Sequence, residues 1–176
     1  CNEIALYDIY SGQSFHKLTH LHNEEINVVR FANCSPHLLL TASFDKSMKL
    51  FDLRCGMNGR KPVACYENDS VNVMCNWSPD DSSILLSGVG SNLVEVETAG
   101  LREKRKHSIV GRWGSNPARG FRRSVYLSKN MFITATTDDD YVRLMSSSSP
   151  KEYGCFCFGG SLTQTNDWTL GQHQQG

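Results

Sequence analysis

The strongest constraint on the fold of this chain is a short pattern of apolar runs and turns that recurs along it. Residues 22–54 hold apolar runs of strand length, INVVRF, LLLTAS and MKLFDL, separated by a Pro-bearing turn, NCSP, and by a tight turn at 44–47. β-Branched and aromatic residues in the runs, with Asn, Ser, Pro and Asp in the turns, indicate antiparallel hairpins. Both faces of the runs are partly apolar, so we expect neighbouring sheets to cover these strands on both sides. Such a unit cannot be stable alone.

The unit repeats with a period in the forties. An aromatic-Asp pair at Tyr7-Asp8 recurs 44 residues later as Phe51-Asp52. Residues 71–96 and 121–145 repeat the same order of apolar run, turn and apolar run. Four-stranded blades of a β-propeller have this period. The sequence therefore predicts an all-β fold over residues 1–146: a partial β-propeller of about three to four blades, each an antiparallel four-stranded sheet. Because complete propellers need typically 4–8 blades, we expect the chain to be a piece of a longer one.

Residues 22–54 resemble a WD repeat, in which a His, a Ser or Thr, an Asp and a Trp are linked by hydrogen bonds. His22, Thr41, Asp45 and Phe51 stand at these four positions. The resemblance implies that the first three form a structural network. Phe51 stands where Trp is usual, and a phenyl ring has no N–H to donate.

The other copies keep less of this pattern, although the resemblance covers roughly residues 2–146. The copy at 71–96 has no His, turn Asp or Trp-Asp pair. In the last copy Thr134 and Asp138 fit, but Met145-Ser146 stand in place of Trp-Asp. These departures leave residues 22–54 as the best copy.

The end of that best copy, Leu50 to Arg54, is similar to a box in WD-repeat substrate receptors of cullin-RING ubiquitin ligases. The box consists of an aromatic residue, an Asp, any residue and an Arg. The resemblance implies that Asp52 and Arg54 contact a large adaptor, the damage-binding protein subunit, while Asp45 supports the turn. An Arg at a rigid strand end suits a planar, bidentate contact with a partner. The alternative is that Arg54 pairs with a local Asp on the propeller surface. The predicted function is a protein-interaction scaffold, and its more specific form is such a substrate receptor.

The segment 101–123 carries the strongest charge bias in a chain whose 18 Lys and Arg balance its 18 Asp and Glu. We interpret the segment as a solvated loop between blades. A second hypothesis is that its cations form a basic patch of a nucleic-acid or chromatin-associated propeller. The residues of this basic patch would be Arg102, Lys104, Arg105, Lys106, Arg122 and Arg123.

No catalytic motif is found, so we predict no enzymatic activity and no cofactor. The chain lacks a G-x-S-x-G elbow, a Gly-rich phosphate loop and an H-E-x-x-H motif. His16, His20 and His22 cluster without Cys or carboxylate partners at metal-site spacing, and the CFCF run at 155–158 has no second cysteine pair. We therefore predict no metal site.

Two features concern the environment of the chain and its end. Seven scattered cysteines argue against a disulfide framework and favour a reducing compartment, the nucleus or cytoplasm. No apolar stretch approaches the length of a membrane span. Residues 147–176 are rich in Ser, Gly and Gln, and we expect a disordered tail there.

Overall fold

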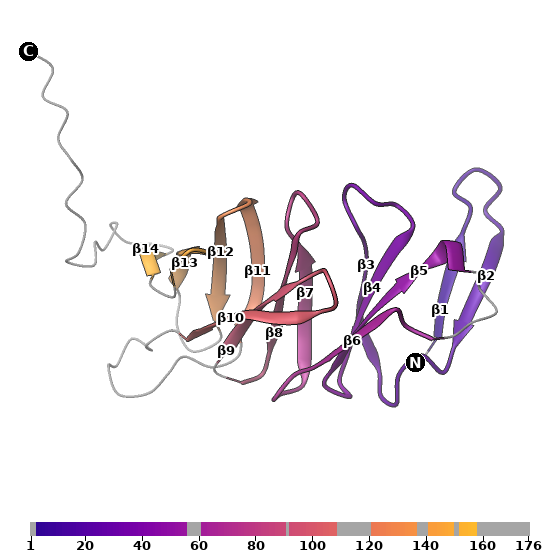
Figure 1. Ribbon diagram of the computed structural model, residues 1–176, viewed down its shortest axis with the longest axis horizontal. Helices are drawn as coiled ribbons and strands as arrows, with labels where there is room; N and C mark the ends of the chain where they lie inside the picture. Colours follow the sequence, from indigo (N-terminus) through magenta and orange to yellow (C-terminus); the bar gives the residue numbers. More distant parts are fainter. Residues whose placement is uncertain are drawn as a thin grey trace, which may run out of the picture.

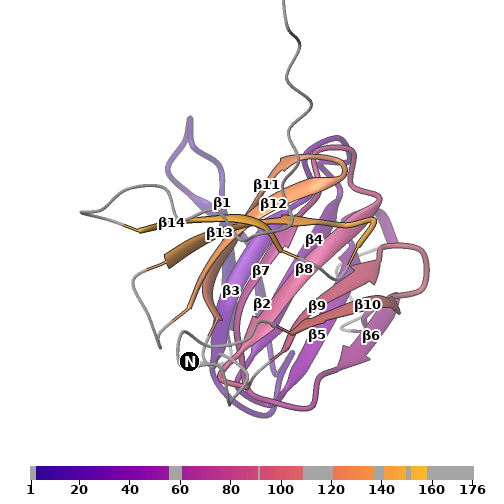
Figure 2. The ribbon, with the colours of Figure 1, turned by 90° about the vertical axis from the view of Figure 1, so that its left-hand side faces the viewer.

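The structure is a computed structural model that describes residues 3–55, 61–90, 92–108, 121–136, 141–149 and 152–157. Its strands form four antiparallel sheets that stand side by side in a row (Figure 1). Figure 2, viewed along that row, shows the sheets stacked one behind another with a common twist. We call these sheets blades 1 to 4 in chain order.

Each blade joins strands that follow one another in sequence. Blade 1 pairs β1 (Glu3–Tyr7) with β2 (Ser14–Thr19). Blade 2 contains β3 (Ile26–Phe31), β4 (Leu38–Ser43), β5 (Ser47–Asp52) and β6 (Ala64–Glu67), with the 3-10 turn η1 (Leu53–Cys55) after β5. Blade 3 contains β7 (Asn72–Trp77), β8 (Ser83–Gly88), β9 (Asn92–Glu97) and β10 (Arg102–Ser108). Blade 4 contains β11 (Phe121–Ser128), β12 (Met131–Thr136), β13 (Tyr141–Ser146) and β14 (Glu152–Cys157). The predicted all-β propeller architecture is confirmed.

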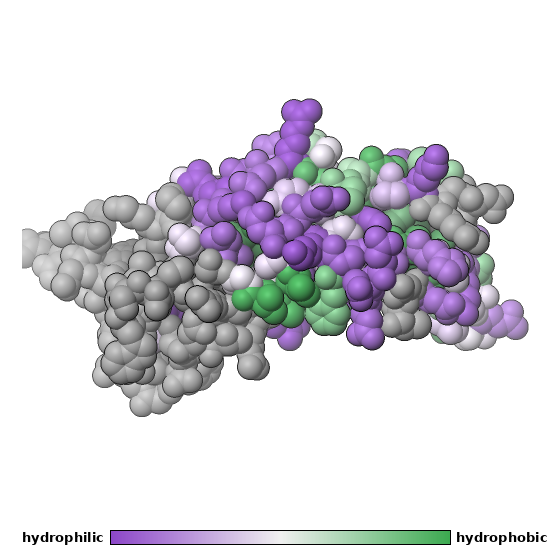
Figure 3. Space-filling view, turned by 90° about the horizontal axis from the view of Figure 1, so that it is seen from below, coloured by the Kyte–Doolittle hydropathy of each residue, from purple (hydrophilic) through white to green (hydrophobic). Residues whose placement is uncertain are grey.

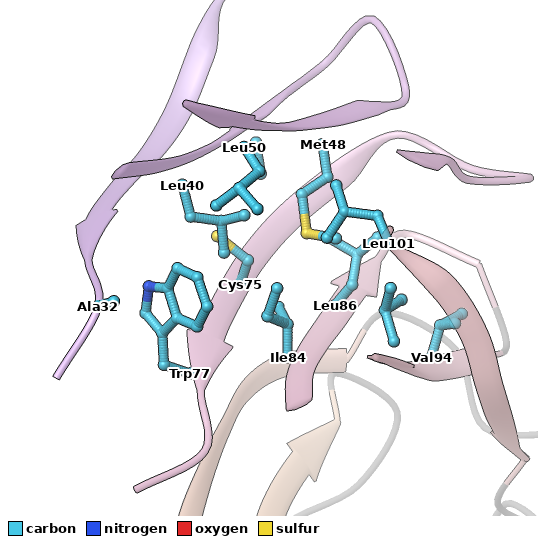
Figure 4. Packing of buried hydrophobic residues seen from close by; sticks show 12 residues of the cluster. Ala32, Leu40, Met48, Leu50, Cys75, Trp77, Ile84, Leu86, Val94 and Leu101 are labelled. Atoms are coloured by element: carbon cyan, nitrogen blue, oxygen red, sulfur yellow. The ribbon is translucent and has the colours of Figure 1, made fainter. Parts of the chain in front are cut away.

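The hydrophobic core lies between the blades. Between blades 2 and 3, Leu40 and Met48 lie in one cluster with Ile84, Leu86 and Val94, all fully buried (Figure 4). Burying one such side chain contributes about 1.5–3 kcal/mol. Two further clusters occupy the interfaces of blades 1 and 2 and of blades 3 and 4. Blades 2 and 3 therefore bury apolar residues on both faces, which is why their strands do not alternate cleanly between polar and apolar.

Asparagine side chains connect the first strands of neighbouring blades. Asn27 Nδ2 on β3 donates to the backbone carbonyl of Asn72 on β7 at 2.6 Å. Asn76 Nδ2 on β7 donates to the carbonyl of Ser124 on β11 at 2.6 Å. These bonds tie each first strand to the backbone of the first strand in the next blade.

A single carboxylate links blades 2 and 3 at the β3–β4 connection. Asp81, in the β7–β8 turn, accepts the backbone N–H groups of Asn33 at 2.8 Å, Cys34 at 2.6 Å and Ser35 at 3.1 Å. Asp81 is buried and its φ is 57°, in the left-handed region that Asp tolerates better than most residues. Three charge-assisted hydrogen bonds to one turn fix the position of that turn.

Two sequence predictions are corrected by the strands. The segment 101–123 is not a loop throughout, because Arg102–Ser108 is β10, the outer strand of blade 3. The charged residues of this segment lack the apolar alternation that identifies a strand in sequence. In the structure the backbone pairs with β9 and the cations lie at the surface. The segment 147–176 is not wholly a tail, because β14 pairs with β13. Residues 109–120 and 158–176 lie outside the described residues.

Helical structure in the described residues is limited to η1, and none of it is long and apolar enough to cross a membrane. Figure 3 shows the ends of the blades that lie at the bottom of Figure 1, opposite the turn between β1 and β2. Hydrophilic residues make up most of the coloured part of this face, and hydrophobic residues show near its middle and toward the blade 1 side.

The Asp81 contact predicts a large loss of stability when its carboxylate is removed. We expect Asp81→Ala to lower the free energy of unfolding by about 2–4 kcal/mol, because three backbone N–H groups lose a buried, charged acceptor. Urea titration followed by tryptophan fluorescence measures this change. Asp69→Ala, which removes an exposed partner of Lys106, is the control and should leave the midpoint unchanged. Equal midpoints for the two variants would contradict the role given to Asp81.

Candidate functional site

The structure brings His22, Thr41 and Asp45 together at one end of blade 2. His22 Nδ1 lies 3.0 Å from Asp45 Oδ2, and Nε2 lies 2.7 Å from Thr41 Oγ1. With the Nδ1 proton donated to Asp45, Nε2 accepts from the Thr41 hydroxyl. Ser47, which the sequence analysis did not single out, adds a hydroxyl that donates to Asp45 Oδ1 at 2.6 Å. The network connects the segment before β3 to β4 and to the β4–β5 turn.

Burial and hydrogen bonding oppose each other in this network. Burial lowers the pKa of His22 from its ordinary value of 6.5, and Asp45 only partly offsets that effect. Burial alone would raise the pKa of Asp45, but hydrogen bonds from the Ser47 hydroxyl and from the backbone of Ser47 and Asn23 lower it well below 3.8. His22 is thus favoured as neutral and Asp45 as ionised.

Phe51 lies outside the hydrogen-bonded network. It is buried in the cluster between blades 1 and 2, with Ile4, Leu6 and Leu39. The Thr41 hydroxyl bonds to His22 Nε2 at 2.7 Å, and the phenyl ring of Phe51 offers no N–H that could extend the network.

Asp52 and Arg54 form a closed pair where β5 runs into η1. Arg54 Nε donates to Asp52 Oδ1 at 3.1 Å, and Nη2 donates to Oδ2 at 2.7 Å. The Arg54 backbone N–H also donates to Oδ1 at 2.9 Å. The Arg54 side chain is 67% exposed and that of Asp52 only 12%. The local pairing that the sequence left open is therefore present, and the guanidinium still faces solvent.

The Arg54 guanidinium keeps this pair ionised. Its side-chain hydrogen bonds, together with the Arg54 backbone N–H, lower the pKa of Asp52 to about 2. The same pairing raises the pKa of Arg54. The pair therefore stays charged at any physiological pH. Asp45 lies in the β4–β5 turn, at the other end of β5, where it binds His22.

The Asp52 turn has equivalents in the other blades. Three residues occupy the same position in the strand register of their blades. Asp52 pairs with Leu38 in blade 2, Glu97 with Ser83 in blade 3, and Ser146 with Met131 in blade 4. Asp8 follows β1 as Asp52 ends β5.

In three of these turns the side chain accepts the N–H group two residues later. The three bonds are Tyr10 to Asp8 at 2.7 Å, Arg54 to Asp52 at 2.9 Å and Ser148 to Ser146 at 3.0 Å. The residue two positions later is thus Tyr10, Arg54, Ala99 and Ser148 in blades 1 to 4. Only blade 2 places a charge there.

The structure does not gather the predicted basic patch into one surface. Arg102, Lys104, Arg105 and Lys106 lie on β10, the outer edge of blade 3, whereas Arg123 lies on β11, which packs on β7 and β8. The side chain of Arg122 lies outside the described residues. Lys104 pairs with Glu95 at 2.9 Å and Lys106 with Asp69 at 2.9 Å. Two of the cations are therefore partly neutralised within the chain.

A buried charged cluster between blades 3 and 4 was missed from sequence. Glu95 is fully buried and accepts from Lys104 Nζ at 2.9 Å and from Tyr126 Oη at 3.1 Å. Its other oxygen lies 3.6 Å from Nε2 of His107, which is also fully buried. Burial alone would raise the pKa of Glu95, but His107 and Lys104 lower it to about 2. The only sequence signal that Glu95 is buried is the alternation in LVEVE. This alternation places Glu95 on the face of β9 that carries Leu93.

No group of three or more His, Cys, Asp or Glu side chains suited to a metal ion occurs in the part of the chain that the structure describes. His16 lies on β2, His20 and His22 lie beyond its end, and His22 is engaged by Asp45 and Thr41. The side chains of the CFCF run lie outside the described residues.

Meandering four-stranded blades, one of them held by a His–Thr–Asp network, define this chain as blades of a WD-repeat β-propeller. Comparison with known proteins agrees. Over 140 residues the chain is 38% identical to the protein DWD HYPERSENSITIVE TO UV-B 1 of Arabidopsis thaliana, covering 80% of this chain and 17% of that protein. It also resembles the crystal structure of the β-propeller domain of Cps50 (Swd1) from Myceliophteria thermophila, with a TM-score of 0.73 and 13% identity, over 91% of this chain and 50% of that one. No protein-family model matches the chain.

These comparisons differ in what they establish. The solved propeller shares too little sequence to show more than the fold. The chain spans 17% of the length of the curated relative that it matches.

The His22 network predicts a specific pH dependence of stability. Because folding lowers the pKa of His22, the unfolded chain binds a proton more readily, and stability falls as pH drops below about 6.5. The lowered pKa of Asp45 adds a further loss below about pH 4. We expect His22→Gln to cost about 2 kcal/mol at pH 7 and to flatten the decline between pH 7 and 5.5.

Urea titrations at several pH values measure both effects. His16→Gln, at an exposed position of β2, is the matched control and should keep the wild-type slope. An unchanged slope in His22→Gln would show that His22 does not titrate as the geometry requires.

Proposed function

We propose that this protein is a protein-interaction scaffold that serves as a substrate receptor of a cullin-RING E3 ubiquitin ligase. Its Asp52–Arg54 turn docks on the damage-binding adaptor subunit. The observation that carries the proposal is the exposed, rigidly held guanidinium of Arg54, at a turn position where the other blades have uncharged residues. Exposed Arg side chains in fixed geometry are common anchors of protein interfaces.

Similarity to a relative supports the same proposal. The Arabidopsis protein carries the term DWD in its name and is 38% identical over most of this chain. The box that ends residues 22–54 resembles that of ligase receptors in its aromatic residue, Asp and Arg. Such a receptor works inside the cell, in the nucleus or cytoplasm, which agrees with the scattered free cysteines.

The geometry favours scaffolding over the alternatives. Among the described residues the two buried polar clusters, around His22 and around Glu95, lie between strands and blades, where Asp45 pairs with His22 and Lys104 pairs with Glu95, so we interpret them as structural. We therefore propose no enzymatic role. The nucleic-acid hypothesis gains no support from β10, because Lys104 and Lys106 are paired with carboxylates.

Loss of Arg54 tests the proposal directly. We expect Arg54→Ala in the full-length protein to weaken binding of the purified adaptor at least about tenfold, because an anchor side chain at an interface is worth about 2 kcal/mol or more. Biolayer interferometry or calorimetry measures the dissociation constant. The stability of the variant should not change, because the Arg54 side chain lies on the surface.

The repeated turn supplies matched controls for this experiment. Tyr10→Ala and Ser148→Ala change the equivalent residue in blades 1 and 4 and should leave adaptor binding intact. Adaptor binding by Arg54→Ala with wild-type affinity would refute the docking proposal.

A further inference from the structure

The Asp52 carboxylate occupies one side of the Arg54 guanidinium and leaves the other free. A guanidinium carries five N–H donors in one plane. Asp52 takes the Nε–H and one Nη2–H. Among the described residues no hydrogen bond engages Nη1. Three N–H groups remain, and two of them, one on Nη1 and one on Nη2, lie along the edge of the plane that points away from Asp52.

Asp52 itself is poorly placed to touch a partner. Its side chain is 12% exposed, against 67% for Arg54. Its two oxygens already accept the Arg54 side chain and the Arg54 backbone N–H. One carboxylate therefore fixes both the backbone of the turn and the plane of the guanidinium. The neighbouring Leu53 N–H donates to the His37 carbonyl at 2.8 Å, which holds the turn against the β3–β4 connection.

The charge balance of this site favours an uncharged acceptor. Asp52 already neutralises Arg54, so the free edge needs no counter-ion. A carboxylate from a partner would lie across the same guanidinium from Asp52 and be repelled by it. The equivalent positions in neighbouring blades, Tyr10 and Ala99, supply no second cation to offset that repulsion. Carbonyl oxygens satisfy the same donors without this cost.

We infer that Asp52 is a positioning residue, and that the adaptor binds the Nη1–Nη2 edge of Arg54 with a pair of neutral carbonyl oxygens. This inference rests on the proposed function and adds to it the chemistry of the contact. A guanidinium held in one plane before binding loses less conformational entropy when the complex forms. Affinity then depends on the planar edge and on Asp52, and little on the ionic strength.

A double-mutant cycle tests the positioning role. The dissociation constant of the adaptor is measured for the full-length wild type, Asp52→Ala, Arg54→Ala and the double variant. We expect Asp52→Ala to weaken binding about tenfold when Arg54 is present and to have no further effect in the Arg54→Ala background. Arg54→Lys keeps the charge but lacks the planar edge, so its loss should match that of Arg54→Ala. Asp8→Ala removes the same backbone acceptor from the blade 1 turn, and it should leave binding unchanged.

Salt titration identifies the acceptor. We expect the wild-type dissociation constant to stay within about twofold between low and physiological ionic strength, because no net charge is matched across the contact. In Asp52→Ala the unpaired guanidinium should make the remaining affinity more sensitive to salt.

The outcomes separate the inference from the function on which it rests. A further loss for Asp52→Ala in the Arg54→Ala background would mean that Asp52 contacts the adaptor. A steep loss of wild-type affinity with salt would mean that the acceptor is a carboxylate. Either result overturns the inference and leaves the docking proposal standing. Wild-type affinity in Arg54→Ala would overturn both.

Discussion

Face-to-face hydrophobic packing between neighbouring sheets is the interaction on which this structure depends. A single four-stranded blade exposes apolar residues on both faces and gains little from its own hydrogen bonds, because water satisfies the same groups in the unfolded chain. Stability is acquired only when the next blade covers each face. Leu40 and Met48 of blade 2 are fully buried because Ile84, Leu86 and Val94 of blade 3 lie against them. Every other contact refines an arrangement that this packing creates.

Polar groups at the blade interfaces set the order and register of the blades. Asn27, Asn76 and Asp81 each bond to the backbone of a neighbouring blade, where a hydrophobic contact would tolerate small shifts. The His22 network does the same within blade 2. Burying Glu95 costs more free energy than burying an asparagine amide, because the charge must be compensated. Lys104, Tyr126 and His107 surround the carboxylate. The interface of blades 3 and 4 thus combines an apolar cluster with a compensated charge.

Much of the blade pattern could be predicted because it is periodic. Apolar runs, turn residues and the aromatic-Asp spacing located the strands of blade 2 and the repeat that generates the others. The β10 strand was not predictable in this way, because its cations mask the period-two pattern. The Asp81 contact joins residues that only the stacking of blades brings together. Glu95 was missed because burial of a charge depends on partners from β10 and β11 that no local pattern reveals. For Arg54, sequence indicated the candidate site but could not show that Asp52 holds its guanidinium.

The repeated turn at the ends of β1, β5 and β13 separates folding from recognition. In each of these turns a side chain accepts the N–H group two residues later, and this bond does not depend on which residue supplies that N–H. Tyr10, Arg54 and Ser148 can therefore diverge without disturbing the blade below them. In evolutionary terms, a duplicated blade brings with it an outward position free to vary, so a propeller can acquire or lose a binding partner by one substitution at little cost to its fold.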